Sequence, residues 1–88
     1  MTPGQMPSRP LTGRPDACVP QWLVDDYLES YIRWREECAN VHHAYTHWLA
    51  AARPDRALAF ASYGQALDRE EHAAQLLSEH ATRIRRLL

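Results

Sequence analysis

The chain has 88 residues, enough for one domain, but a domain of this size buries little of its surface unless it is stapled or oligomeric. Ten basic residues, all of them arginine, nearly balance eleven acidic residues, so the charge predicts no nucleic-acid partner. No apolar run approaches the roughly 20 residues of a membrane span, and the N-terminus lacks the apolar core of a signal peptide. We therefore expect a cytoplasmic protein with no membrane partner.

The first 19 residues are rich in proline and glycine and show no hydrophobic periodicity. This composition is typical of segments that bury too little apolar surface to fold. We predict a disordered Pro-rich tail over residues 1–19 and a helical hairpin domain over residues 20–88. A short partner-binding motif within the tail is the alternative. The prolines of the tail are Pro3, Pro7, Pro10 and Pro15.

A first helix is predicted over residues 20–52. Pro20 suits the first turn of a helix, where its missing N–H is not needed, and no glycine or proline follows until Pro54. Large side chains recur at spacings of three and four, which places them on one stripe of the helix and favours coiled-coil-like packing. The predicted core or interface residues of this helix are Tyr27, Tyr31, Trp34, Cys38, Val41, Tyr45 and Trp48.

A second helix is predicted over residues 54–87. Pro54 disfavours helical backbone at Arg53 and can itself open a helix, so the turn is short and the two helices must be antiparallel neighbours. Its apolar stripe has the same spacing, with smaller residues in the middle. Gly64 interrupts this helix, and such a glycine usually has a packing reason because it costs about 1 kcal/mol relative to alanine. The predicted core or interface residues are Phe60, Leu67, Leu77 and Ile84.

Together these patterns predict an all-α fold, a coiled-coil-like antiparallel hairpin of two helices. A lone hairpin encloses no core, because each helix covers only one side of the other. The aromatic rings of the stripe would stay partly in water, although each can bury about 150 to 250 Å². We therefore expect a homodimer that forms a four-helix bundle, or a helical protein partner that covers the same stripe.

Three carboxylates, Glu37, Glu70 and Glu71, fall near the middle of the two helices, where antiparallel pairing brings Glu37 opposite Glu70. They form either a structural polar layer, neutralised by nearby arginines, or the metal site of a ferritin-like half-bundle. Ferritin-like sites use Glu-x-x-His motifs, and here Arg69 stands three residues before His72. We favour the structural layer and expect no cofactor.

No group of residues in this sequence predicts catalysis. The serines lack a converging histidine and carboxylate, and no Gly-rich phosphate-binding loop is present. His43 and His47 are four residues apart and could approach one metal ion, but a single helix face supplies too few ligands for a closed site. We therefore predict a non-enzymatic protein–protein interaction or self-assembly module.

Overall fold

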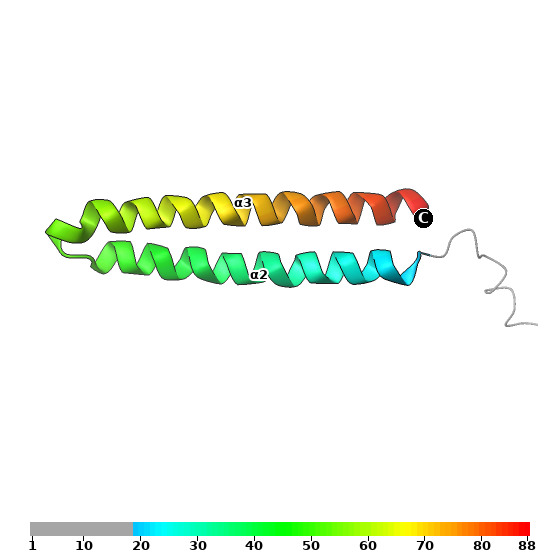
Figure 1. Ribbon diagram of the computed structural model, residues 1–88, viewed down its shortest axis with the longest axis horizontal. Helices are drawn as coiled ribbons and strands as arrows, with labels where there is room; N and C mark the ends of the chain where they lie inside the picture. Colours follow the sequence, from blue (N-terminus) through cyan, green and yellow to red (C-terminus); the bar gives the residue numbers. More distant parts are fainter. Residues whose placement is uncertain (1–18) are drawn as a thin grey trace, which may run out of the picture.

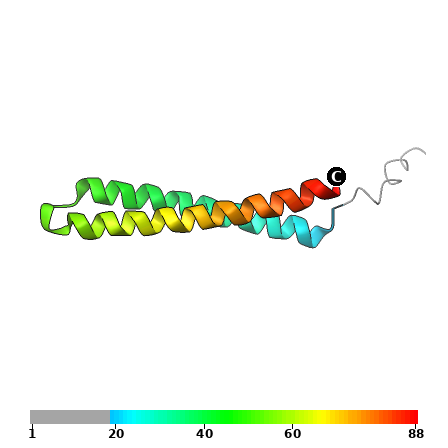
Figure 2. The same cartoon turned by 90° about the horizontal axis from the view of Figure 1, so that it is seen from above.

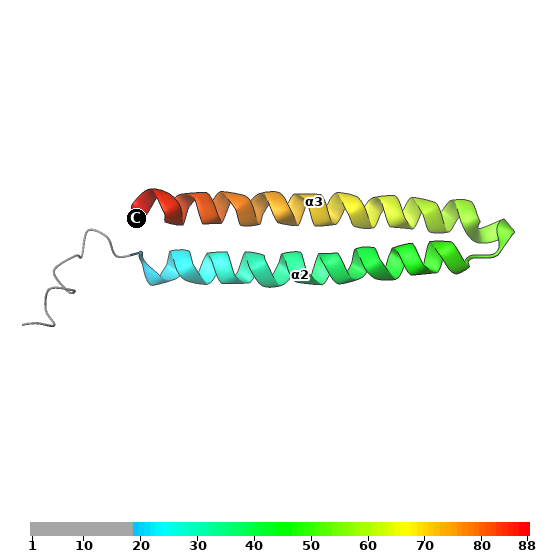
Figure 3. The same ribbon diagram turned by 180° about the vertical axis from the view of Figure 1, so that it is seen from behind.

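The protein folds as an antiparallel hairpin of two long helices. The computed structural model describes residues 19–88, in which α2 spans Gln21–Ala50 and α3 spans Arg56–Leu87. The helices lie side by side along their whole length, and the C-terminus returns to the start of α2 (Figures 1 and 3). No strand occurs within residues 19–88, so the predicted all-α hairpin is confirmed. The tail predicted for residues 1–19 lies outside the described residues, apart from its last position.

Two prolines set the boundaries of the helices. The carbonyl oxygen of Pro20 accepts hydrogen bonds from the backbone N–H groups of Leu23 and Val24, at 3.0 and 3.3 Å, and so begins α2. Ala51 and Ala52 are extended, so α2 ends two residues before the predicted boundary. A short 3-10 helix, η3, spans Arg53–Asp55 and contains Pro54. The extended pair reverses the chain direction before the proline restarts the helical backbone.

A row of alanines forms the closest contact of α3 with α2. Ala59, Ala66 and Ala73 are seven residues apart and are buried, with exposed fractions of 3, 1 and 4%. The contact line of α3 also includes half-buried residues at the intervening heptad positions. These residues are Tyr63, Glu70, Leu77, His80 and Ile84. Small side chains at every seventh position let two helices approach closely, because the separation of helix axes depends on the side chains at the contact.

The facing line of α2 consists of two rows that follow the same heptad pattern. Its residues are buried or half-buried, and they follow one another at spacings of four and three. One row contains three aromatic residues and consists of Tyr27, Trp34, Val41 and Trp48; the other has smaller side chains at most positions and consists of Leu23, Ser30, Glu37, Ala44 and Ala51. The heptad period is the period expected for two helices that keep one seam in contact by supercoiling. In Figure 2 the helices accordingly cross one another along their length.

About half of the predicted stripe residues lie on the contact lines, and the others lie one residue beside them. Six predicted core or interface residues lie on the contact lines: Tyr27, Trp34, Val41, Trp48, Leu77 and Ile84. The remaining five, Tyr31, Cys38, Tyr45, Phe60 and Leu67, lie beside the contact and not within it. At four of these five positions the neighbouring contact residue is a serine or an alanine, which lets the two helices approach closely.

The packing reason expected for Gly64 is absent within the described residues. A Cβ atom built at this position meets no heavy atom within 4 Å, and the backbone is helical. Gly64→Ala should therefore stabilise the hairpin by up to about 1 kcal/mol, the cost of glycine relative to alanine inside a helix. Thermal unfolding followed by circular dichroism measures this change. A lower melting temperature for the variant would show that another molecule occupies the space above Gly64.

Candidate functional site

Four aromatic rings from both helices form a cluster near the turn. The ring centroid of Trp48 in α2 lies 4.9 Å from that of Phe60 and 5.6 Å from that of Tyr63 in α3. The Tyr45 and Tyr63 centroids are 5.5 Å apart. These separations fall in the favourable range for aromatic pairs, about 4.5 to 7 Å. The cluster joins the helices on one side of the hairpin, yet Tyr45 and Phe60 remain 42 and 53% exposed.

The side of the hairpin that carries this cluster is apolar along its length. On each helix, one of the two contact rows has the smaller side chains; on α3 it is the alanine row. The residue that follows each member of that row is apolar, and these apolar residues recur every seventh position. In an antiparallel pair the two rows border the same side of the contact. We name this surface the apolar flank. It consists of Val24, Tyr31, Cys38 and Tyr45 from α2 and of Phe60, Leu67, Ala74, Ala81 and Leu88 from α3 and its C-cap.

Large apolar side chains of this flank face solvent. Tyr31, Tyr45, Phe60, Leu67 and Leu88 are all exposed, and Leu28 and Leu49 extend the exposed apolar surface along the α2 border. Single exposed hydrophobic residues are ordinary on protein surfaces, but a contiguous patch of them marks an interaction site. The predicted stripe residues that lie one position beside the contact lines are therefore the residues that form this surface.

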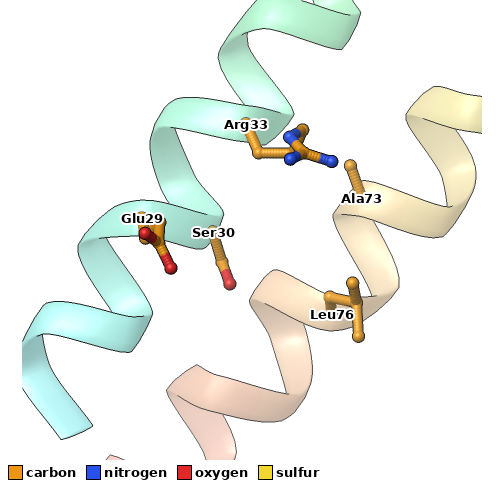
Figure 4. Close-up of a pocket in the computed structure, with 5 residues that line it drawn as sticks. All are labelled: Glu29, Ser30, Arg33, Ala73 and Leu76. Atoms are coloured by element: carbon orange, nitrogen blue, oxygen red, sulfur yellow. The ribbon is translucent and has the colours of Figure 1, made fainter. Parts of the chain in front are cut away.

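The opposite side of the hairpin is polar, and we name it the polar flank. On each helix it contains the residue that comes just before each member of the contact row with the larger side chains. These residues are Asp26, Arg33, Asn40 and His47 from α2 and Ser62, Arg69, Leu76 and Arg83 from α3. Arg69 Nε lies 3.4 Å from Glu37 Oε1 and pairs the two helices on this side. An open groove between the helices is lined by Glu29, Ser30, Arg33, Ala73 and Leu76 (Figure 4).

A hydrogen bond joins the helices at the middle of the hairpin. The indole Nε1 of Trp34 donates to Oε2 of Glu70 at 2.8 Å. Both residues are half-buried on the contact lines, in the rows that border the apolar flank. The sequence placed Glu70 on the core line but did not identify Trp34 as its donor. The available signal was the heptad phase, which places both Trp34 and Glu70 on the contact stripes near the middle of the two helices.

The three carboxylates of the predicted polar layer occupy different environments. Glu37 is paired with Arg69, Glu70 accepts from Trp34, and Glu71 is exposed. No group of three or more histidine, cysteine, aspartate or glutamate side chains is close enough to hold a metal ion among the described residues. The pairing of Glu37 with Arg69 supports neutralisation by arginine. The ferritin-like alternative stays a prediction, which elemental analysis of protein purified without chelator can test.

Neither a membrane span nor a known relative indicates the function of the described hairpin. Within residues 19–88, neither helix carries an apolar stretch long enough to span a bilayer. No protein-family model, curated protein or solved structure matches the chain.

Proposed function

We propose that this protein is a non-enzymatic self-association module whose apolar flank binds the same flank of a second copy. The observation that carries this proposal is the row of exposed large apolar side chains that recurs every seventh position along the apolar flank. Water contact with such a row is unfavourable by roughly 25 cal/mol for each Å² of apolar surface. Two hairpins that cover each other's flanks form a four-helix bundle with an enclosed core.

The dimensions of the flank suit a stable dimer. A helix of the length of α2 extends about 45 Å, and two adjacent helices are about 20 Å wide, which gives a flank of roughly 900 Å² on each copy. Specific protein complexes bury about 800 Å² on each partner. Because the polar flank carries arginine, aspartate and histidine side chains, association through the apolar flank closes on itself as a dimer and does not extend into a filament.

A matched pair of leucine variants tests the proposal. Leu67 lies on the apolar flank and Leu76 on the polar flank, both are on α3, and both are 39% exposed. We expect Leu67→Glu to weaken dimerisation by at least tenfold, because the dimer would bury a new carboxylate. Leu76→Glu should change the dimerisation constant less than threefold. Sedimentation velocity over micromolar concentrations measures both constants, and circular dichroism checks that both variants stay helical.

Two results would contradict the proposal. One is an unmodified chain that sediments as a monomer throughout the micromolar range, since the exposed flank would then need a different protein to cover it. The other is an equal loss of association in the Leu67→Glu and Leu76→Glu variants, since the apolar flank would then have no special part in the contact.

A further inference from the structure

A second hairpin can cover the apolar flank in two ways that satisfy two-fold symmetry. In the same-end arrangement the two turns lie together, and α2 of each copy packs on α3 of its partner. In the opposite-end arrangement the turns lie at opposite ends, so that α2 packs on α2 and α3 on α3. Neighbouring helices are antiparallel in both cases, and helix packing geometry alone favours neither. The charges along the flank distinguish them.

Two opposite charges border the flank at the middle of the hairpin. Arg35 follows Trp34 on α2, and Glu71 follows Glu70 on α3; both are exposed. They lie at the same height along the hairpin, because the Trp34 to Glu70 hydrogen bond joins the residues next to them. Each of these two residues occupies the heptad position just outside the apolar row of its helix. A partner helix that packs on the apolar row would have this position at its edge, and we name this edge the rim.

The two arrangements bring different charges together at this rim. In the same-end arrangement Arg35 faces the partner's Glu71, and symmetry repeats this opposite-charge pair at the second rim. In the opposite-end arrangement Arg35 faces the partner's Arg35 and Glu71 faces the partner's Glu71. Complementary charges across an interface fix its register, and like charges placed together oppose it. The charge pairs at both rims therefore favour the same-end arrangement.

The carboxylate at the centre of the flank favours the same arrangement. Glu70 lies on the row that borders the flank, and Trp34 Nε1 donates to one of its two oxygens. Opposite-end packing would set Glu70 against the partner's Glu70 in a site that has lost its water, which is costly for two carboxylates. Same-end packing instead sets Glu70 against the partner's Trp34, beside the partner's Arg35.

From these juxtapositions we infer that two copies of the chain associate with their turns at the same end, with Arg35 of each copy paired to the partner's Glu71 across both rims of the apolar flank. This inference rests on the proposed self-association and adds its orientation. The occupant of the flank is thus a second copy of this chain in one defined register.

Charge reversal at the rim tests the orientation. In the same-end dimer, Arg35→Glu places two carboxylates together at both rims, and we expect about tenfold weaker dimerisation. Glu71→Arg should weaken it to a similar extent, and the double variant should return to within about threefold of the unmodified chain. In the opposite-end dimer, Arg35→Glu only exchanges one like-charge pair for another, so that an unchanged constant would overturn the inference. Arg33→Glu, on the polar flank two residues away, controls for the change in net charge.

The distance between the turns gives an independent measurement. A spin label at Asp55→Cys, in a full-length chain that also carries Cys18→Ser and Cys38→Ala, reports this distance by pulsed electron resonance. Two turns at the same end lie about 25 Å apart, whereas turns at opposite ends are separated by at least the helix length of about 45 Å. A distance near the longer value would overturn the orientation and leave the dimer intact. Absence of any dipolar signal at dimer-forming concentrations would contradict the self-association itself.

Discussion

Replacing Trp34 with alanine is expected to lower the free energy of unfolding by about 3 kcal/mol, near the lower end of the range for removing a packed tryptophan. The side chain lies on the contact line of α2, its ring centroid is 6.1 Å from that of Tyr31, and its N–H donates to Glu70. The variant loses apolar burial on the seam and leaves the Glu70 carboxylate without its donor. Urea denaturation at one fixed protein concentration measures the change, because association contributes to the stability of a dimer.

Two further variants separate these contributions. Trp34→Phe keeps a large ring but removes the N–H, and it should cost about 1 kcal/mol, the usual net value of one hydrogen bond. Trp22 is 61% exposed, so Trp22→Ala should change the free energy of unfolding by no more than about 0.5 kcal/mol. An effect of Trp34→Ala no larger than that of Trp22→Ala would show that Trp34 does not hold the helices together.

Replacing Ala66 with leucine is expected to destabilise the hairpin by about 2 kcal/mol, in the range known for overpacked cores. Ala66 is 1% exposed and is the middle alanine of the contact row on α3. Three additional carbon atoms at this point must push α2 away or force neighbouring side chains from their preferred rotamers. For a domain of this size we expect the melting temperature to fall by about 10 °C.

Ala61 provides the control for this substitution. It lies on the same helix and is exposed, and leucine has nearly the same helix propensity as alanine. Ala61→Leu should therefore leave the melting temperature almost unchanged. Equal melting temperatures for the two leucine variants would mean that the helices do not approach closely at Ala66.

The two edges of the helix contact carry different kinds of side chain. The buried row of α3 consists of alanines, and its neighbours towards the polar flank leave room for the Arg69 to Glu37 pair. On the other edge, the contact rows carry rings and aliphatic side chains from both helices. These side chains project towards the apolar flank and add to its surface. A hairpin packed in this way pairs charged side chains across one edge of the contact and leaves apolar side chains exposed at the other.

The helices of this fold and the turn between them follow from local features of the sequence. Long runs without glycine or proline define two helices, the Arg53-Pro54-Asp55 segment separates them, and a turn that short makes them antiparallel. The heptad spacing also placed Trp34 and Trp48 on one predicted stripe, and both lie on the contact line of α2. These features are local, since they depend on backbone propensity and on residues within two turns of one another.

Which of two adjacent rows forms the seam depends on how the two helices pack together. Ala66 and Leu67 are neighbours on α3, as Ala44 and Tyr45 are on α2, and the hydrophobic pattern favours the larger residue of each pair. The seam took the smaller one, because two helices pack closely only where short side chains let their backbones approach. The larger residues were thereby placed on the apolar flank, and the indole of Trp34 met the carboxylate of Glu70, a contact between residues 36 positions apart that no local pattern encodes.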